Sequence, residues 1–256
     1  MGCVVRNGRL RLSQGQIFWR ETGQGKAIAF IHREYSEGSQ WLEFLGNLGQ
    51  DYQCFAPDLL GFGDSDPVVP LQSIQWQSEI LAEFFTQLNL KKIYLIGDSL
   101  GAWIAARYAL NYPEQIQGLI LLSPIGLETS QNVNLLLAKL LLFPVPILPF
   151  FLQSLLPLGK ILGFKKAIQK TLNYRLQLLA SPASRRLLFQ RRPREIQAEY
   201  LKTELSQLTM PTLILSQNQE TDQAKSYAQG IPQAELIKIE QKSEAIALIK
   251  DWLKQQ

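Results

Sequence analysis

Ser99 lies in the segment 93–112, IYLIGDSLGAWIAARYALNY, between an apolar run and a helical pattern. A serine on a sharp strand-to-helix turn is displayed as a nucleophile, and Gly97 and Gly101 supply the small neighbours that this strained turn needs. The turn also places the backbone N–H of Leu100 at a helix N-terminus, where it can stabilise a developing oxyanion. The pattern therefore predicts that Ser99 is placed as a nucleophile, and its chemistry depends on a base that could activate it.

The base that would activate this serine is hard to find. The chain has one histidine, His32, far upstream of Ser99, and histidine is the usual base near neutral pH. In enzymes where a serine nucleophile works with a histidine base, removal of the histidine lowers turnover about a million-fold. Three replacements are conceivable, namely His32 itself, a lysine such as Lys238 or Lys242, or a group from a partner, and the sequence supports none of them.

The elements that must position Ser99 alternate along the chain. Apolar side chains at helical spacing predict a helix over 76–88. Small side chains indicate a second helix over 102–109 that lies close to the sheet. A last helix is expected over about 244–253. Short apolar runs predict strands at 16–21, 27–31, 53–56, 93–96, 118–123, 211–216 and 235–239. This alternation predicts an α/β fold with a mostly parallel, twisted sheet flanked by helices.

The strand signal disappears between residues 127 and 208. Residues 140–159 carry no charge and are long enough to raise the question of a transmembrane helix. Pro144, Pro146, Pro149 and Pro157 argue against one continuous helix. We therefore expect a core of residues 1–127 and 209–256, with an apolar helical cap inserted at 128–208.

The charge is unevenly distributed. Residues 130–202 hold 12 Lys and Arg against two acids, Glu195 and Glu199, which predicts a face that meets an anionic surface or, alternatively, solvated helix faces. Two cysteines, Cys3 and Cys54, give no disulfide framework. With no signal peptide pattern at the N-terminus, we expect a cytoplasmic protein, with membrane association as an open alternative.

With these residues in view, the chain resembles the α/β-hydrolase superfamily, in its esterase, lipase and epoxide-hydrolase-like branch with a helical cap. The resemblance covers 16–127 and 209–256, including PDLLGFGDSD at 57–66, YPEQIQGLILLSP at 112–124 and PTLIL at 211–215. It implies a triad in the order Ser, acid, His, with Ser99 as the nucleophile and Glu220, or less favourably Asp222, as the acid. The loop that should hold the histidine looks deleted, because 239–240 runs almost directly into the final helix.

The resemblance also places His32 in the His-Gly pair that shapes the family's oxyanion hole. Here the glycine position is Arg33 and the second donor, beside Leu100, would be Glu34. A carboxylate at this point would repel an oxyanion unless it turned away. For His32 we favour a supporting histidine, hydrogen-bonded within its loop, over a general base.

Two functions remain open. The first is an inactive or weakly active member of the superfamily that binds an apolar, acyl- or isoprenoid-like small molecule or lipid, or a membrane or protein partner. The second is an active serine ester hydrolase with an unorthodox base. Either is compatible with a peripheral membrane contact through 140–170, where the cations are Lys160, Lys165, Lys166, Lys170 and, just beyond, Arg175. We expect no cofactor, no metal and no nucleic-acid partner, since the motifs for these are missing.

Overall fold

The computed structural model describes residues 4–67, 72–127, 137–138, 140–142, 147–161, 163–217 and 221–256. Eight strands form one sheet in the order β1-β2-β4-β3-β5-β6-β7-β8. They are β1 (Arg6–Leu12), β2 (Gly15–Thr22), β3 (Ala27–Ile31), β4 (Gln53–Asp58), β5 (Ile93–Asp98), β6 (Ile116–Leu122), β7 (Thr212–Gln217) and β8 (Ala234–Ile239). The pairs β1/β2 and β2/β4 are antiparallel and the others are parallel, so the mostly parallel sheet is confirmed.

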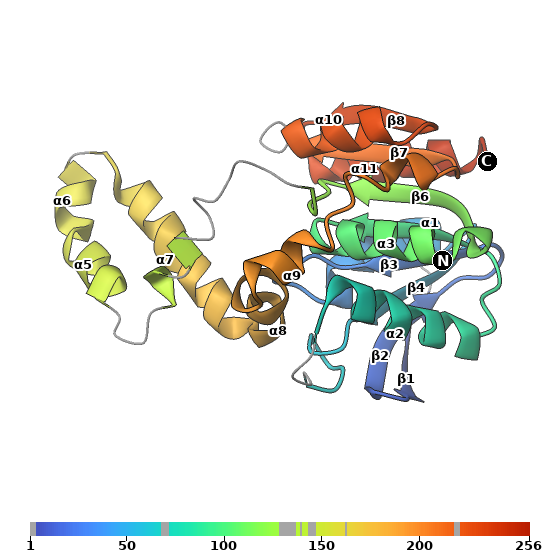
Figure 1. Cartoon of the computed structure of the whole chain (residues 1–256), viewed down its shortest axis with the longest axis horizontal. Helices are drawn as coiled ribbons and strands as arrows, with labels where there is room; N and C mark the ends of the chain where they lie inside the picture. Colours follow the sequence, from blue (N-terminus) through green and yellow to red (C-terminus); the bar gives the residue numbers. More distant parts are fainter. Residues whose placement is uncertain are drawn as a thin grey trace.

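Helices cover both faces of this sheet (Figure 1). Along β3, Ala27, Ala29 and Ile31 join the core under α2 (Ile74–Gln87), α3 (Leu100–Asn111) and α10 (Thr221–Gly230), whereas Ile28 and Phe30 join the core under α1 (Leu42–Leu48) and α11 (Lys242–Leu253). Alternate side chains of a strand point to opposite faces. A strand buried on both faces therefore reads as a continuous apolar run, which explains why β3 and β5 are visible in the sequence.

The sequence analysis missed β1. Its residues, RNGRLRL, are mostly polar and exposed, and only Leu12 is buried. The strand lies at the edge of the sheet and pairs with β2 through backbone hydrogen bonds, which need no apolar run.

A group of helices follows β6 and precedes β7 along the chain. They are α5 (Ile147–Ser154), α6 (Leu156–Ile161), α7 (Lys165–Ala180), α8 (Pro182–Arg185) and α9 (Pro193–Gln197), with a π-helical turn, η3 (Arg186–Gln190), after α8. Three short 3₁₀ turns, η1 (Gly38–Trp41), η2 (Pro113–Gln115) and η4 (Leu205–Gln207), complete the described helices. Figure 1 shows α5, α6 and the start of α7 far from the sheet, whereas α8 and α9 lie beside it. The cap boundaries at 128 and 208 stay a prediction.

The apolar stretch 140–159 forms short helices where it is described. α5 has 8 residues and α6 has 6. Within the described part of the chain, no helix combines the length and the apolar composition that crossing a bilayer requires.

Candidate functional site

Ser99 occupies a strained turn between β5 and α3. Its backbone has φ 54° and ψ −107°, a region that non-glycine residues rarely adopt and that costs about 1–3 kcal/mol. The Ser99 N–H donates to the Leu122 carbonyl at 2.9 Å, and its own carbonyl accepts from Ala102 and Trp103. The side chain is buried, with 2% of the residue exposed. The sharp turn predicted from the sequence is therefore present.

The glycines at this turn permit close packing of backbones. A Cβ on Gly97 would lie 2.3 Å from the Gly101 carbonyl oxygen, and a Cβ on Gly101 would lie 2.2 Å from the Ile31 carbonyl oxygen. Both positions therefore exclude a side chain, and α3 begins directly against the ends of β3 and β5.

The backbone N–H of Leu100 already has an acceptor. It donates to Oε2 of Glu34 at 3.4 Å. The carboxylate lies at the N-terminus of α3, where the helix dipole favours negative charge. Glu34 therefore does not turn away in this structure. Its carboxylate accepts the Leu100 N–H that an oxyanion would need.

The cap holds the turn that carries Glu34. The Ser184 hydroxyl donates a hydrogen bond to the Glu34 carbonyl oxygen, and the Ser181 hydroxyl lies 3.5 Å from the same atom. The next residue, Tyr35, meets Tyr174 of α7 edge-to-face with ring centroids 6.1 Å apart. Contacts from the region of α7 and α8 therefore hold the Glu34 carbonyl and the side chain that follows it.

The sheet side holds the same turn. The Arg33 N–H donates to Oε1 of Gln40 at 3.1 Å, and Nε2 of Gln40 donates to Asp98, the residue before Ser99, at 3.1 Å. Neither Gln40 nor the cap serines was singled out from the sequence. No local motif marks them, because their partners are distant in the chain.

A buried carboxylate fixes the start of η1. Asp58 is fully buried and accepts from Arg20 and from the N–H of Gly38, both at 2.7 Å, and from the N–H of Asp64 at 2.8 Å. These bonds satisfy the charge. Asp58 begins the DLLGFGDSD stretch that the sequence analysis quoted, yet its role there is to hold loops together.

His32 has both ring nitrogens engaged. Nδ1 donates to the Arg33 carbonyl at 2.8 Å, while Nε2 accepts from the Leu59 N–H at 3.1 Å. This network assigns the neutral tautomer with hydrogen on Nδ1. The ring is fully buried against Phe62, and burial lowers the pKa of His32. In this arrangement His32 has no free nitrogen to take the Ser99 proton.

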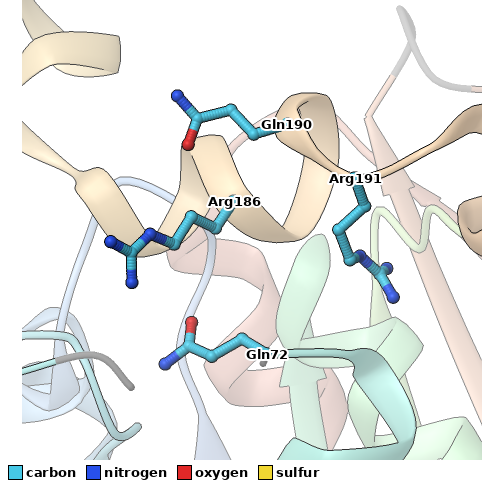
Figure 2. Close-up of a pocket in the computed structure, with 4 residues that line it drawn as sticks. All are labelled: Gln72, Arg186, Gln190 and Arg191. Carbon is cyan, nitrogen blue, oxygen red and sulfur yellow. The ribbon is translucent and has the colours of Figure 1, made fainter. Parts of the chain in front are cut away.

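A cavity lies between the body and η3 (Figure 2). Its volume is about 270 Å³, and it is lined by Gln72, Arg186, Gln190 and Arg191. Arg191 pairs with Glu199 at 2.5 Å. Amide and guanidinium groups line this space, so it is not the apolar pocket that the composition of the cap predicts, and that prediction stays untested.

A family model described as alpha/beta hydrolase fold matches residues 27–244. The chain belongs to the α/β-hydrolase family. The resemblance recognised in the sequence is therefore confirmed.

Relatives of this α/β-hydrolase include an uncharacterised protein of Mycobacterium tuberculosis, 30% identical over 157 residues, which cover 60% of this chain and 46% of that protein. The 2-hydroxy-6-oxo-6-phenylhexa-2,4-dienoate hydrolase of Burkholderia cepacia is 32% identical over 124 residues, covering 46% and 43% of the two chains. The match thus spans about half the length, or less, of these relatives. A thermophilic esterase from Thermogutta terrifontis has the same fold, with a TM-score of 0.72, 20% identity and 98% of each chain covered.

The remaining triad positions of this α/β-hydrolase are only partly described. Glu220, the expected acid, lies outside the described residues, and Asp222 is exposed in the first turn of α10. Between β8 and α11 there are only Glu240 and Gln241, so the connection leaves no room for the expected histidine loop. Lys238 is exposed on β8 and Lys242 begins α11. Among the described residues, no group of three or more His, Cys, Asp or Glu is arranged to hold a metal ion.

Proposed function

We propose that this α/β-hydrolase is a binding protein whose hydrolytic activity is lost or strongly reduced. The observation that carries the proposal is the carboxylate of Glu34 on the Leu100 N–H. Acyl transfer builds negative charge on the carbonyl oxygen, and the site must supply donors for it. The Glu34 carboxylate accepts the hydrogen bond of the Leu100 N–H, and its negative charge repels the charge that develops on the carbonyl oxygen. Loss of one such donor lowers turnover by about a hundred- to a thousand-fold.

The lack of an available histidine base points the same way, since His32 is the one histidine of the sequence. The ring of His32 is committed on both sides, and the β8–α11 connection has two residues. A serine hydroxyl without a base is a weak nucleophile. Either defect alone would make a poor enzyme, and together they favour a scaffold that binds without turning over.

The ligand that we propose is an apolar chain of the acyl or isoprenoid type. The support is the composition of the cap, where Leu, Phe and Pro dominate residues 135–164. Apolar linings favour such chains over polar molecules.

A second function is favoured by the strain at Ser99. A backbone held at φ 54° is typical of working nucleophile turns. In an active serine ester hydrolase, Glu34 would be the unorthodox base, because its carboxylate lies one residue from Ser99 across the Leu100 N–H. It would take the hydroxyl proton as the Ser99 oxygen bonds to the ester carbonyl carbon, and would return that proton to the alcohol as the ester C–O bond breaks. Water would then release the acid from Ser99. The hydrolase of Burkholderia cepacia, which is 32% identical over 124 residues, suits this alternative.

Titration with p-nitrophenyl palmitate tests the two functions, with binding and p-nitrophenol release followed together. The binding protein is expected to bind the ester equally well as wild type and as Ser99→Ala, with the same background release from both. Release that depends on Ser99 would overturn the proposal. If Glu34→Gln then abolished that release, Glu34 would be the base of an active enzyme.

A further inference from the structure

Exposed apolar side chains are concentrated in the cap. Among the described residues, nine large apolar side chains are exposed, and seven of them lie between residues 140 and 179. The most exposed of these seven are Phe150 at 73%, Leu176 at 60% and Phe151 at 56%. Scattered exposed apolar residues are normal, but a concentration in one region marks an interaction surface.

The exposed side of α7 has an amphipathic pattern. Leu172, Leu176 and Leu179 are spaced four and three residues apart, which places them on one face of the helix, and the last two are exposed. Lys165, Lys166 and Lys170 are exposed near the start of the same helix. A helix that combines exposed apolar side chains with exposed lysines is typical of helices that lie in a membrane interface.

The charge of this region has one sign. From residue 129 to residue 194 the chain holds eleven Lys and Arg and no Asp or Glu. A protein partner for such a surface would have to present a negative patch of matching extent. A surface with only cations beside exposed aromatic and aliphatic side chains is complementary to a lipid surface, where negative headgroups lie above an apolar interior.

The position of the helices suits such a contact. Figure 1 shows α5, α6 and the start of α7 together at the end of the molecule farthest from the sheet. Their own core is small, with Ala138, Leu141 and Leu178 as its fully buried members. A planar surface could therefore reach them without meeting the body.

We propose that the outer surface of α5, α6 and α7 docks on an anionic lipid bilayer. The helices would lie in the interface, with Phe150 and Phe151 inserted among the acyl chains and Lys165, Lys166 and Lys170 against the phosphate groups. No described helix could span the bilayer, so the contact is peripheral. It holds whether or not Ser99 is catalytic, and its failure would leave the proposed binding function untouched.

Co-sedimentation of the full chain with vesicles tests this inference. Binding is expected to vesicles of equal parts phosphatidylcholine and phosphatidylserine, to weaken in high salt and to be much weaker on phosphatidylcholine alone. Phe150→Ser with Phe151→Ser should weaken binding at least about tenfold. Reversal of the three lysines to glutamate should weaken it at least about a hundredfold.

Matched controls come from exposed residues of the body. Leu42→Ser, at a side chain 47% exposed on α1, and Lys91→Glu with Lys92→Glu, both exposed, should leave vesicle binding unchanged. The inference is wrong if the folded wild type stays in the supernatant with both vesicle types. It is also wrong if the phenylalanine variant abolishes self-association of the chain while vesicle binding persists, since the surface would then join two copies.

Discussion

Glu34 and Leu100 lie 66 positions apart in the chain, yet the Leu100 N–H donates to the Glu34 carboxylate across 3.4 Å. The bond joins the turn after β3 to the first residue of α3, at one of the two backbone N–H groups that an α/β-hydrolase uses for its oxyanion hole. It is held from the cap through Ser184 and from the sheet through Gln40. A side chain of the protein itself therefore occupies the donor that an oxyanion would use.

Neutralising Glu34 should destabilise the fold slightly. A carboxylate at a helix N-terminus contributes about 0.3–1 kcal/mol, and salt screens it. We expect Glu34→Gln to lower the free energy of unfolding in urea by that amount at low salt, and less at high salt. Glu235→Gln, at an exposed strand residue, serves as the control. Equal stability of the two variants would contradict the Glu34–Leu100 contact.

Replacing Ser99 by glycine should stabilise the protein. Glycine adopts positive φ without strain, and within the described residues the Ser99 hydroxyl has no hydrogen-bond partner to lose. We expect Ser99→Gly to raise the free energy of unfolding by about 1 kcal/mol. Ser99→Ala, which keeps the strain, should give no gain. A less stable Ser99→Gly would instead mean that the hydroxyl holds the turn together.

Acid should destabilise the protein through His32. Burial lowers the pKa of this histidine in the folded state, whereas its pKa in the unfolded chain is about 6.5. Below that pH the unfolded state binds a proton that the folded state resists, so the free energy of unfolding falls as pH falls, by up to about 1.4 kcal/mol per pH unit. Urea unfolding of wild type and His32→Gln between about pH 8 and about pH 5, on either side of that pKa, should give free energies of unfolding that converge toward acid pH. Parallel curves would show that His32 ionises freely in the fold.

A methyl group at Gly101 should be costly. The Cβ would meet the Ile31 and His32 carbonyl oxygens at 2.2 and 2.6 Å, and backbone atoms cannot move away as a flexible side chain can. We expect Gly101→Ala to cost about 3 kcal/mol or more. Gly46, in α1, has open space around it, so Gly46→Ala should stabilise by up to about 1 kcal/mol. Thermal melts of the two variants that coincide would contradict the packing described here.

The buried strands and the serine turn were predictable because both signals are local. Continuous apolar runs give β3, β5 and β7, and Gly97, Ser99 and Gly101 give the turn. β1 was not predictable, because a polar edge strand has no apolar run to reveal it.

The closure of the site was only half visible in the sequence. Glu34 could be named as misplaced, but whether it turned toward Leu100 depends on contacts across the fold. Ser181 and Ser184 approach Glu34 from about 150 residues away, and nothing in their local pattern indicates this. The commitment of His32 to Leu59 likewise depends on tertiary packing.

Labelling with a fluorophosphonate probe tests most directly whether Ser99 is activated, because the probe needs no knowledge of the substrate. Wild type and Ser99→Ala would be incubated with the probe and followed by intact mass, with folding verified by circular dichroism. Our account predicts that the two proteins label at the same background rate. Rapid, stoichiometric labelling of wild type that Ser99→Ala abolishes would contradict it.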